Sequence, residues 1–507
     1  MKKHPRGGAT LKAMRTPRPP TRISLAIAAG LALGPAVGCA TNPVSGGQDF
    51  VLMSEEEEIA LGHQAQKQVL QNYQPYRDPA LQARVERIGQ ELAAQSHRPD
   101  LAYHFTLLDS EEVNAFALPG GYIYITRGLL VYLESDAELA AVLGHEIGHV
   151  TARHSVRQDS AQTATRLGVA VASIFTPGYA GAAAGGLAGA FGGALLSGYG
   201  REHELEADRL GAEYLAQVGY DPDALLRVIG TLKDQEAFEI QRASEEGRQP
   251  QVYHGVFASH PTSDQRLQEV VKAARTLEVS EPRPENREEF LNDLDGVAYG
   301  PSTRQGVVRG RSFSHADLGI GLRFPSGWAV QNQPQTVVAI APGNEAVVEL
   351  TLDERGQHAT PEEFLRWKLR VSPESHTAAY RVSGLPAYTT VSSGQTPWGR
   401  RDIRYVVIFV GKQVYVFQGA ARDYDGLERY DRAFRDTAGS FHALTERESA
   451  RTQGPSVHLL RADDRTHYEG LARNTRIGRN PEQKLRLLNG DYPDGEPAPG
   501  SLVKVVR

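Results

Sequence analysis

Three residues of one short segment have the types and the spacing that bind a catalytic metal ion. His145, Glu146 and His149 form an HExxH pattern. Two histidines four positions apart lie on one face of a helix, about one turn from each other, so both imidazoles can reach the same ion. Glu146 lies beside that site, where it can accept a proton from a water molecule activated by the metal. The alternative is a helix that carries this pattern by chance.

The element that positions these residues is predicted to be a helix from residue 135 to about residue 154. Ser135 is followed three residues later by Glu138, as in a capping box at a helix start. Pattern, helix and cap agree, which favours a metal site over chance. A third histidine six residues after the pattern is absent, because a serine stands there. His154 lies nearly opposite His145 on this helix, which predicts a structural or surface role for His154.

A second helix, from residue 201 to about residue 218, is predicted to supply the third ligand. Glu204 and Asp208 are four residues apart and share a face. Residues two apart on a helix point about 200° away from each other, so Glu206 faces elsewhere when Glu204 faces the metal. We predict that Glu204 is a ligand and that Asp208 orients a ligand histidine. Removal of Glu206 or Glu213 is predicted to leave metal binding almost unchanged.

These segments resemble the HExxH zinc metallopeptidase family that includes the CAAX prenyl protease, HtpX and BepA. The matching residues are 114–121, 145–149, 204–208, and 259–261 with Arg266. The resemblance covers about residues 50–275. It implies a mainly α zincin-type (gluzincin) metalloprotease domain with a small sheet. The sequence lacks the strongly apolar membrane helices of HtpX and the tetratricopeptide-like repeats of BepA, so the partners of BepA are not carried over.

The resemblance also implies roles for individual residues. The implied metal ligands are His145, His149 and Glu204, which hold one Zn²⁺ per chain. The implied catalytic residues are Glu146, Asp208, His260 and Arg266. His260 is expected to bind the oxyanion that develops on the substrate, and Arg266 is expected to pair with Asp208.

The first 39 residues are predicted to be a lipoprotein signal peptide. Seven basic residues precede an apolar run at residues 23–34, and the segment has no acidic residue. The run has the right length for a signal peptide and is short for a membrane span. The segment AVGC at residues 36–39 is similar to a bacterial lipobox, so Cys39 is the predicted lipidation site. The alternative is a plain secretory signal. Ala40 stands where aspartate would favour the inner membrane, so we expect an anchor in the outer membrane that faces the periplasm.

The balance of charges argues against nucleic acid as a partner. The formal net charge is -6, and without the basic residues of the first 39 it falls to about -13. Cys39 is the only cysteine, so disulfides are expected to play no part in the mature fold. The expected partners are protein or peptide substrates and, through the lipid, a membrane.

The protease domain is predicted to span residues 54–280, after a tether at residues 40–53. Helices are expected at residues 54–73 and 79–96, strands at 103–108 and 122–126, and a bend at 114–121. The strand at 122–126 is either a partner for an extended substrate peptide or an ordinary core strand. Residues 167–200 carry no charge and are rich in Gly and Ala. They are predicted to form a helical hairpin or mobile loop over the site, with a membrane span as the alternative.

Two further modules are predicted, which makes the fold class multi-domain. After a polar, Gly-rich linker at residues 281–312, residues 313–443 predict an α+β domain that resembles PsbP. Its strands are expected at 318–324, 336–340, 346–352 and in a hairpin at 403–419, and its helices at 361–370 and 424–441. Residues 455–507 predict a small βααβ domain. It resembles a degenerate LysM module, which implies peptidoglycan as a partner; the alternative is a small stabilising cap.

Together these features predict a lipid-anchored periplasmic zinc endopeptidase that acts in the quality control of envelope proteins. The alternative is a chaperone-like or peptidoglycan-associated binding protein whose zinc site is regulated or structural. Glu146 argues against that alternative, because a purely structural site has no use for a general base.

Overall fold

The computed structural model describes residues 39–50, 53–158, 199–247 and 281–507, together with residues 250, 276, 277 and 279. Within the last range, residues 301, 303, 305, 333–335, 373 and 453 are excluded. The predicted signal peptide up to residue 38, most of the Gly/Ala-rich run, His260 and Arg266 therefore lie outside the described residues.

Two helices open the predicted protease domain where the sequence predicts them. Helix α1 (Glu55–Asn72) begins at Ser54, whose side chain accepts from the backbone N–H of Glu57 while the Glu57 carboxylate accepts from that of Ser54. This is the predicted capping box. Helix α2 (Pro79–Ala93) begins at Asp78, with proline in its first turn. The expected tether before them contains a short antiparallel hairpin of strands β1 (Cys39–Thr41) and β2 (Gln48–Phe50).

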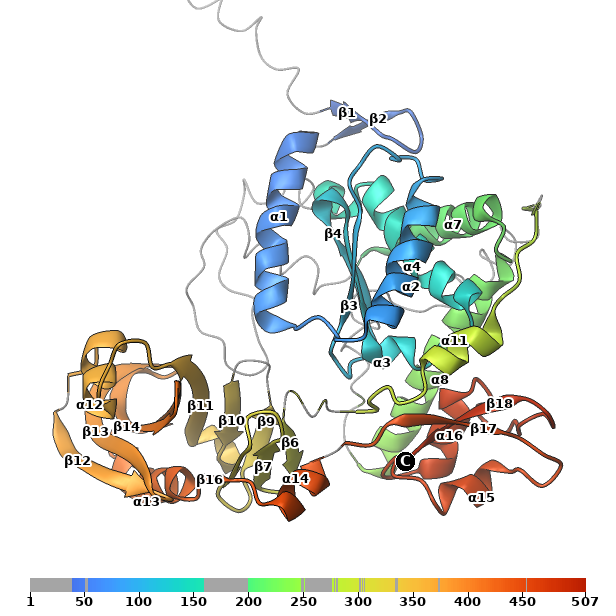
Figure 1. Cartoon of the computed structure of the whole chain (residues 1–507). Coiled ribbons are helices and arrows are strands. Elements are labelled where there is room, and N and C mark those ends of the chain that lie inside the picture. Colours follow the sequence, from blue (N-terminus) through green and yellow to red (C-terminus); the bar gives the residue numbers. More distant parts are fainter. Residues whose placement is uncertain are drawn as a thin grey trace, which may run out of the picture.

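A three-stranded sheet lies beside these helices in the order β3-β5-β4 (Figure 1). Strands β3 (His104–Leu108) and β5 (Tyr122–Thr126) are parallel and fall where the sequence predicts strands. Strand β5 is central and completely buried, so it is a core strand and offers no edge to a substrate. The predicted bend instead contains strand β4 (Ala115–Leu118) and a 3-10 turn (Pro119–Gly121). Among the strands that the structure describes, β4 pairs with β5 alone and occupies an edge of the sheet.

The HExxH helix crosses the core of this domain. Helix α4 (Asp136–Thr151) is capped by Ser135, as predicted, and all of its residues are buried. It packs directly against helix α7 (Arg201–Val218). Glycines make this close packing possible, since a Cβ at Gly148 would lie 2.9 Å from the carbonyl oxygen of Ala207. The close approach brings the first turn of α7 beside the HExxH pattern.

The middle of the chain forms an antiparallel module around a seven-stranded sheet, ordered β12-β13-β14-β15-β11-β10-β9. The predicted strands correspond to β8 (Ile320–Arg323), β10 (Thr336–Ile340), β11 (Ala346–Glu354), β14 (Gly399–Val410) and β15 (Gln413–Ala421). The predicted helices correspond to α12 (Pro361–Glu363) with the π-helical turn Phe364–Lys368, and to α13 (Gly426–Gly439). Strands β9 (Ala329–Asn332), β12 (Ser375–Val382) and β13 (Leu385–Thr396) were not predicted from the sequence. A smaller sheet is ordered β16-β8-β7-β6 and adds β6 (Val307–Arg309), β7 (Ser312–His315) and β16 (His442–Ala443).

The C-terminal segment shares the hydrophobic core of the predicted protease domain. It contains strand β17 (Val457–Arg461), helices α15 (Tyr468–Ala472) and α16 (Pro481–Leu488), and strand β18 (Leu502–Val506), in the predicted order. Tyr468, Leu485 and Val506 are fully buried in the cluster that also contains the residues of α4. These elements lie beside helices α8 (Asp223–Glu245) and α11 (Arg287–Asp293) (Figure 1). Helix α11, inside the expected linker, also buries Phe290 and Leu291 in this core.

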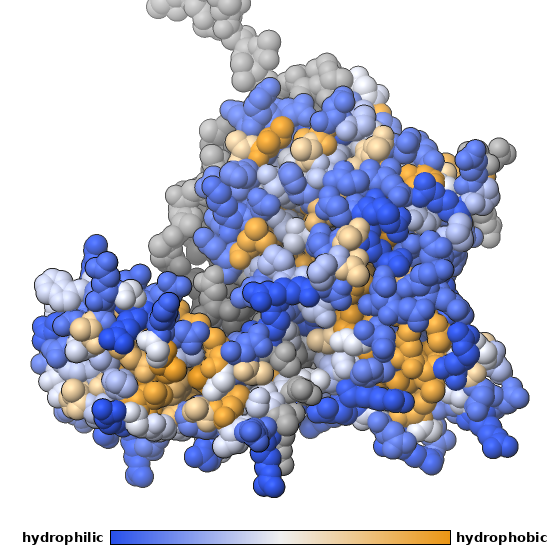
Figure 2. All heavy atoms as spheres, viewed as in Figure 1, coloured by the Kyte–Doolittle hydropathy of each residue, from blue (hydrophilic) through white to orange (hydrophobic). Residues whose placement is uncertain are grey.

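Most of the face drawn in Figure 2 is hydrophilic, with apolar areas over the seven-stranded module and near the C-terminal segment. Trp367 and Tyr424 of the module are 74% and 78% exposed. Among the helices that the structure describes, none has both the length and the apolar character needed to cross a membrane.

Candidate metal centre

Helices α4 and α7 bring the three predicted ligands together in the buried core. His145, His149 and Glu204 each offer an atom, and these atoms lie within 4.8 Å of one another. The two Nε2 atoms of the histidines are 3.0 Å apart. The Glu204 carboxylate lies 3.4 Å from Nε2 of His149 and 3.7 Å from Nε2 of His145. Three donors from two elements therefore converge on one point.

These separations fit a tetrahedral ion. With ligand bonds of about 2.0–2.2 Å, the edge of a tetrahedron of nitrogen and oxygen donors is about 3.3–3.5 Å long. The three measured separations of 3.0, 3.4 and 3.7 Å bracket that edge. Two imidazoles and one carboxylate are also the donor set of many catalytic zinc sites, which leave a fourth position open. The residues present therefore fit zinc.

The outward nitrogen of His145 has an acidic neighbour. Its Nδ1 atom lies 2.8 Å from Oδ1 of Asp208, which is 1% exposed. A carboxylate this close to Nδ1 favours a hydrogen on that nitrogen, which leaves Nε2 free for a metal. Asp208 is one turn after Glu204 on α7, so one helix face supplies both a ligand and the partner of another ligand. This is the arrangement that the four-residue spacing predicted.

The outward nitrogen of His149 meets His154, for which the sequence predicts either a structural or a surface role. Helix α4 ends at Thr151, and Arg153 adopts a left-handed φ of 53°. This turn redirects the chain, so His154 is completely buried and not on the surface. Its Nδ1 lies 2.8 Å from Nδ1 of His149, and its Nε2 lies 3.0 Å from Oε2 of Glu206. The expectation that the helix continues to residue 154 is therefore wrong, because the turn at Arg153 interrupts it.

Burial changes the protonation of His149 beside the centre. It lowers the pKa of His149 well below the ordinary value, so this imidazole stays neutral and keeps a lone pair for a metal. Glu146 is 2% exposed.

The ring of Tyr199 stacks on that of His149, with centroids 4.0 Å apart, and its hydroxyl lies 2.7 Å from Oγ of Ser155. Sequence reasoning missed Tyr199, because it stands just outside the predicted helix.

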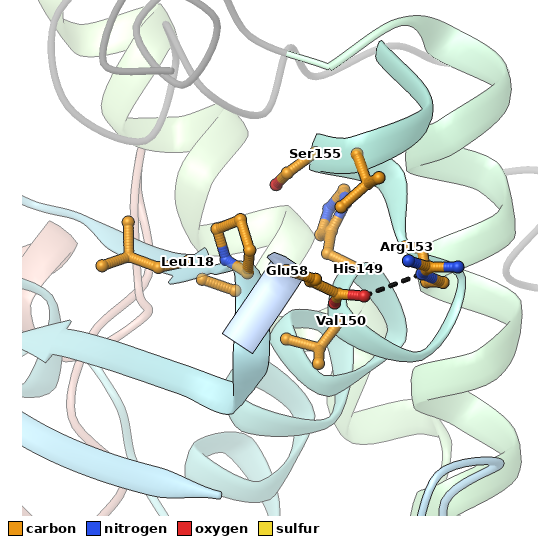
Figure 3. Close-up of a pocket in the computed structure, with 9 residues that line it drawn as sticks. Glu58, Leu118, His149, Val150, Arg153 and Ser155 are labelled. Atoms are coloured by element: carbon orange, nitrogen blue, oxygen red, sulfur yellow. Dashed lines mark hydrogen bonds and ion pairs between the residues drawn. The ribbon is translucent and has the colours of Figure 1, made fainter. Parts of the chain in front are cut away.

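A pocket opens beside His149 (Figure 3). Ala117, Leu118 and Pro119 line one wall from the end of β4, and Val150, Ser155 and Val156 line another. Glu58 of α1 and Arg153 close it, joined by an ion pair of 2.7 Å between Arg153 Nε and Glu58 Oε2. Glu58 also pairs with Arg98 at 2.9 Å. The edge strand, the metal centre and an apolar hollow are thus adjacent.

Comparison with known proteins agrees with this geometry. Residues 79–274 match the family described as Peptidase family M48. The chain contains a peptidase domain of that family. The prediction of an HExxH peptidase of this family is therefore confirmed.

Two relatives, both named beta-barrel assembly-enhancing protease, come from bacteria. The chain is 27% identical to the Escherichia coli (strain K12) protein over 351 residues, which cover 63% of this chain and 68% of that protein. It is 28% identical to the Yersinia pestis protein over 237 residues, which cover 44% of this chain and 45% of that protein. The match to the Yersinia relative thus spans less than half of its length.

The solved structure of cyanobacterial PsbP from Synechocystis aligns with 27% of this chain and 95% of its own, at 15% identity and a TM-score of 0.21. A score this low decides nothing about the fold of residues 313–443. The PsbP-like and LysM-like assignments therefore stay predictions.

Proposed function

We propose that the chain is a zinc-dependent endopeptidase of the bacterial cell envelope that hydrolyses peptide bonds of proteins. The observation that carries this proposal is the convergence of His145, His149 and Glu204 within 4.8 Å, next to Glu146 in a domain of a peptidase family. Zinc bound there would polarise the scissile carbonyl and lower the pKa of a water molecule.

The residues of the chain have separate tasks in this mechanism. Glu146 accepts the proton of the attacking water and passes it to the leaving amine. Asp208 keeps the imidazole of His145 in the orientation that presents Nε2. His260 and Arg266, outside the described residues, are proposed to bind the developing oxyanion and to pair with Asp208.

The edge strand β4 is proposed to hold the substrate. An extended peptide can add to a free sheet edge through backbone hydrogen bonds, with its side chains in adjacent hollows. The pocket beside His149 begins where β4 ends. Leu118, Val150 and Val156 make its walls largely apolar, and its cavity volume of about 10 Å³ is room for roughly one water molecule. Glu58 and Arg153 neutralise each other, so the pocket offers no single charge to attract a charged side chain.

Quality control of envelope proteins is the proposed physiological task. The relatives are named for enhancing β-barrel assembly, and by analogy misassembled envelope proteins are the proposed substrates. A lipid on Cys39 would tether the enzyme to the outer membrane, facing the periplasm. Peptidoglycan is a further proposed partner of residues 455–507.

Substrate trapping tests this proposal. A Glu146→Gln variant, produced in cells with an affinity tag, should retain envelope proteins that the active enzyme releases as fragments. The Glu146→Gln, Glu204→Ala double variant serves as a control that cannot hold a metal ion. Fragments that appear equally with the active enzyme and with both variants would contradict the proposal.

A further inference from the structure

Behind the second histidine ligand, the structure contains a chain of polar side chains that the sequence did not indicate. His149, His154 and Glu206 are linked in series, at 2.8 Å between the two Nδ1 atoms and 3.0 Å between His154 Nε2 and Glu206 Oε2. Arg157 lies at the end of the series, with its guanidinium 2.9 Å from the same carboxylate oxygen. His154 is completely buried, and the side chains of Glu206 and Arg157 are 22% and 25% exposed at the outer end of the series.

The direction of the hydrogen bonds follows from the position of the metal site. Nε2 of His149 points at the other donors and must carry a lone pair to bind an ion, so its Nδ1 carries the hydrogen. That hydrogen is donated to Nδ1 of His154. The hydrogen of His154 is then on Nε2, where it is donated to the carboxylate of Glu206. Each ring has one tautomer that satisfies every contact.

We propose that His154 and Glu206 are positioning residues that fix the tautomer and ring orientation of the metal ligand His149. The two ligand histidines would then each have a carboxylate behind them, Asp208 directly and Glu206 through His154. Such outer partners typically contribute about 10- to 100-fold to metal affinity. This inference rests on the proposed metal site and replaces the expectation that removal of Glu206 leaves metal binding almost unchanged.

The turn that positions His154 requires an unfavourable backbone conformation at the preceding residue. Arg153 has a left-handed φ of 53°, which is unfavourable for a residue with a Cβ. Its side chain is anchored by Glu58 Oε2 at 2.7 Å and by the backbone oxygen of Met53 at 3.0 Å. Helix α1 therefore stabilises the turn that delivers His154 to His149. These contacts favour a defined structural position for His154.

Zinc titration of the full chain tests the inference. The dissociation constant for zinc would be measured by competition with a chelator, and thermal unfolding of the metal-free protein would be recorded beside it. We expect Glu206→Ala and His154→Phe each to weaken zinc binding by about 10- to 100-fold. His154→Gln, which keeps an acceptor and a donor, should lose less than His154→Phe. The exposed Glu202 provides the control, and Glu202→Ala should bind zinc like the wild type.

A double variant separates positioning from general stability. If Glu206 acts through His154, then Glu206→Ala in the His154→Phe background should change the dissociation constant by less than about twofold. Zinc binding by Glu206→Ala within about twofold of the wild type would overturn the inference, whatever its unfolding temperature. If His154→Phe does not fold, Glu206→Ala alone decides. Failure of the wild type itself to bind zinc would overturn the proposed function as well, so the two failures are distinct.

Discussion

Nδ1 of His145 lies 2.8 Å from Oδ1 of Asp208, and both side chains are buried. This contact joins the HExxH helix to the helix that supplies Glu204. We expect Asp208→Ala to bind zinc about 10- to 100-fold more weakly, because the ring loses its outer partner. Peptidase activity should fall further than zinc affinity. Without Asp208 the His145 ring can rotate, so the ion that remains bound is displaced from the position that catalysis requires. Asp221, which is half exposed, is the matched control; Asp221→Ala with the same losses would contradict this role.

Glu204 is expected to be the third ligand. Glu204→Gln removes the charge and the better oxygen donor, and should weaken zinc binding beyond the about 10- to 100-fold that loss of an outer partner costs. Glu213, on the same helix, pairs with Arg209 at 3.8 Å on the surface. Glu213→Gln should therefore retain zinc. Equal zinc affinity of the two variants would mean that another residue completes the site.

Lys504 links the C-terminal strand to the start of the HExxH helix. Its Nζ lies 2.9 Å from the carbonyl oxygens of Val131 and Leu133 and 2.7 Å from Oε1 of Glu134, and its side chain is fully buried. Burial lowers the pKa of Lys504. Lys504→Met would remove the buried donor of the carbonyl oxygens of Val131 and Leu133, while Glu134 keeps Arg287 at 2.6 Å. We therefore expect a loss of about 1–3 kcal/mol in the free energy of unfolding.

Chemical denaturation measures that loss. The control is Lys368→Met, because Lys368 is half exposed and lies 3.8 Å from its acidic partner. This variant should lose less than about 1 kcal/mol. A Lys504→Met protein as stable as the control would show that the C-terminal segment does not support the protease domain.

Cys39 is predicted to carry the lipid. Cys39→Ser should leave the protein in the soluble periplasmic fraction or as an uncleaved precursor, because the thioether cannot form. Partitioning into detergent and membrane fractions measures this. A variant that partitions like the wild type would rule out the anchor.

Local signals in the sequence predicted the helices that carry the site, since Ser54 and Ser135 cap the helices α1 and α4 as expected. The spacing of Glu204 and Asp208 likewise placed them on one face. The position of His154 could not be predicted, because the turn at Arg153 depends on Glu58, which is distant in sequence. The shared core of residues 455–507 and the protease domain depends on tertiary packing, which periodicity does not reveal.

Glu146 is proposed to be the general base of a zinc peptidase. Zinc content and the hydrolysis of a casein substrate, measured on the same preparations of the wild type and Glu146→Gln, test it most directly. We predict that the variant retains zinc, because Glu146 is not among the predicted ligands, and that it loses hydrolysis by at least about 10²- to 10⁴-fold. Hydrolysis by a zinc-loaded Glu146→Gln protein at close to the wild-type rate would contradict the account.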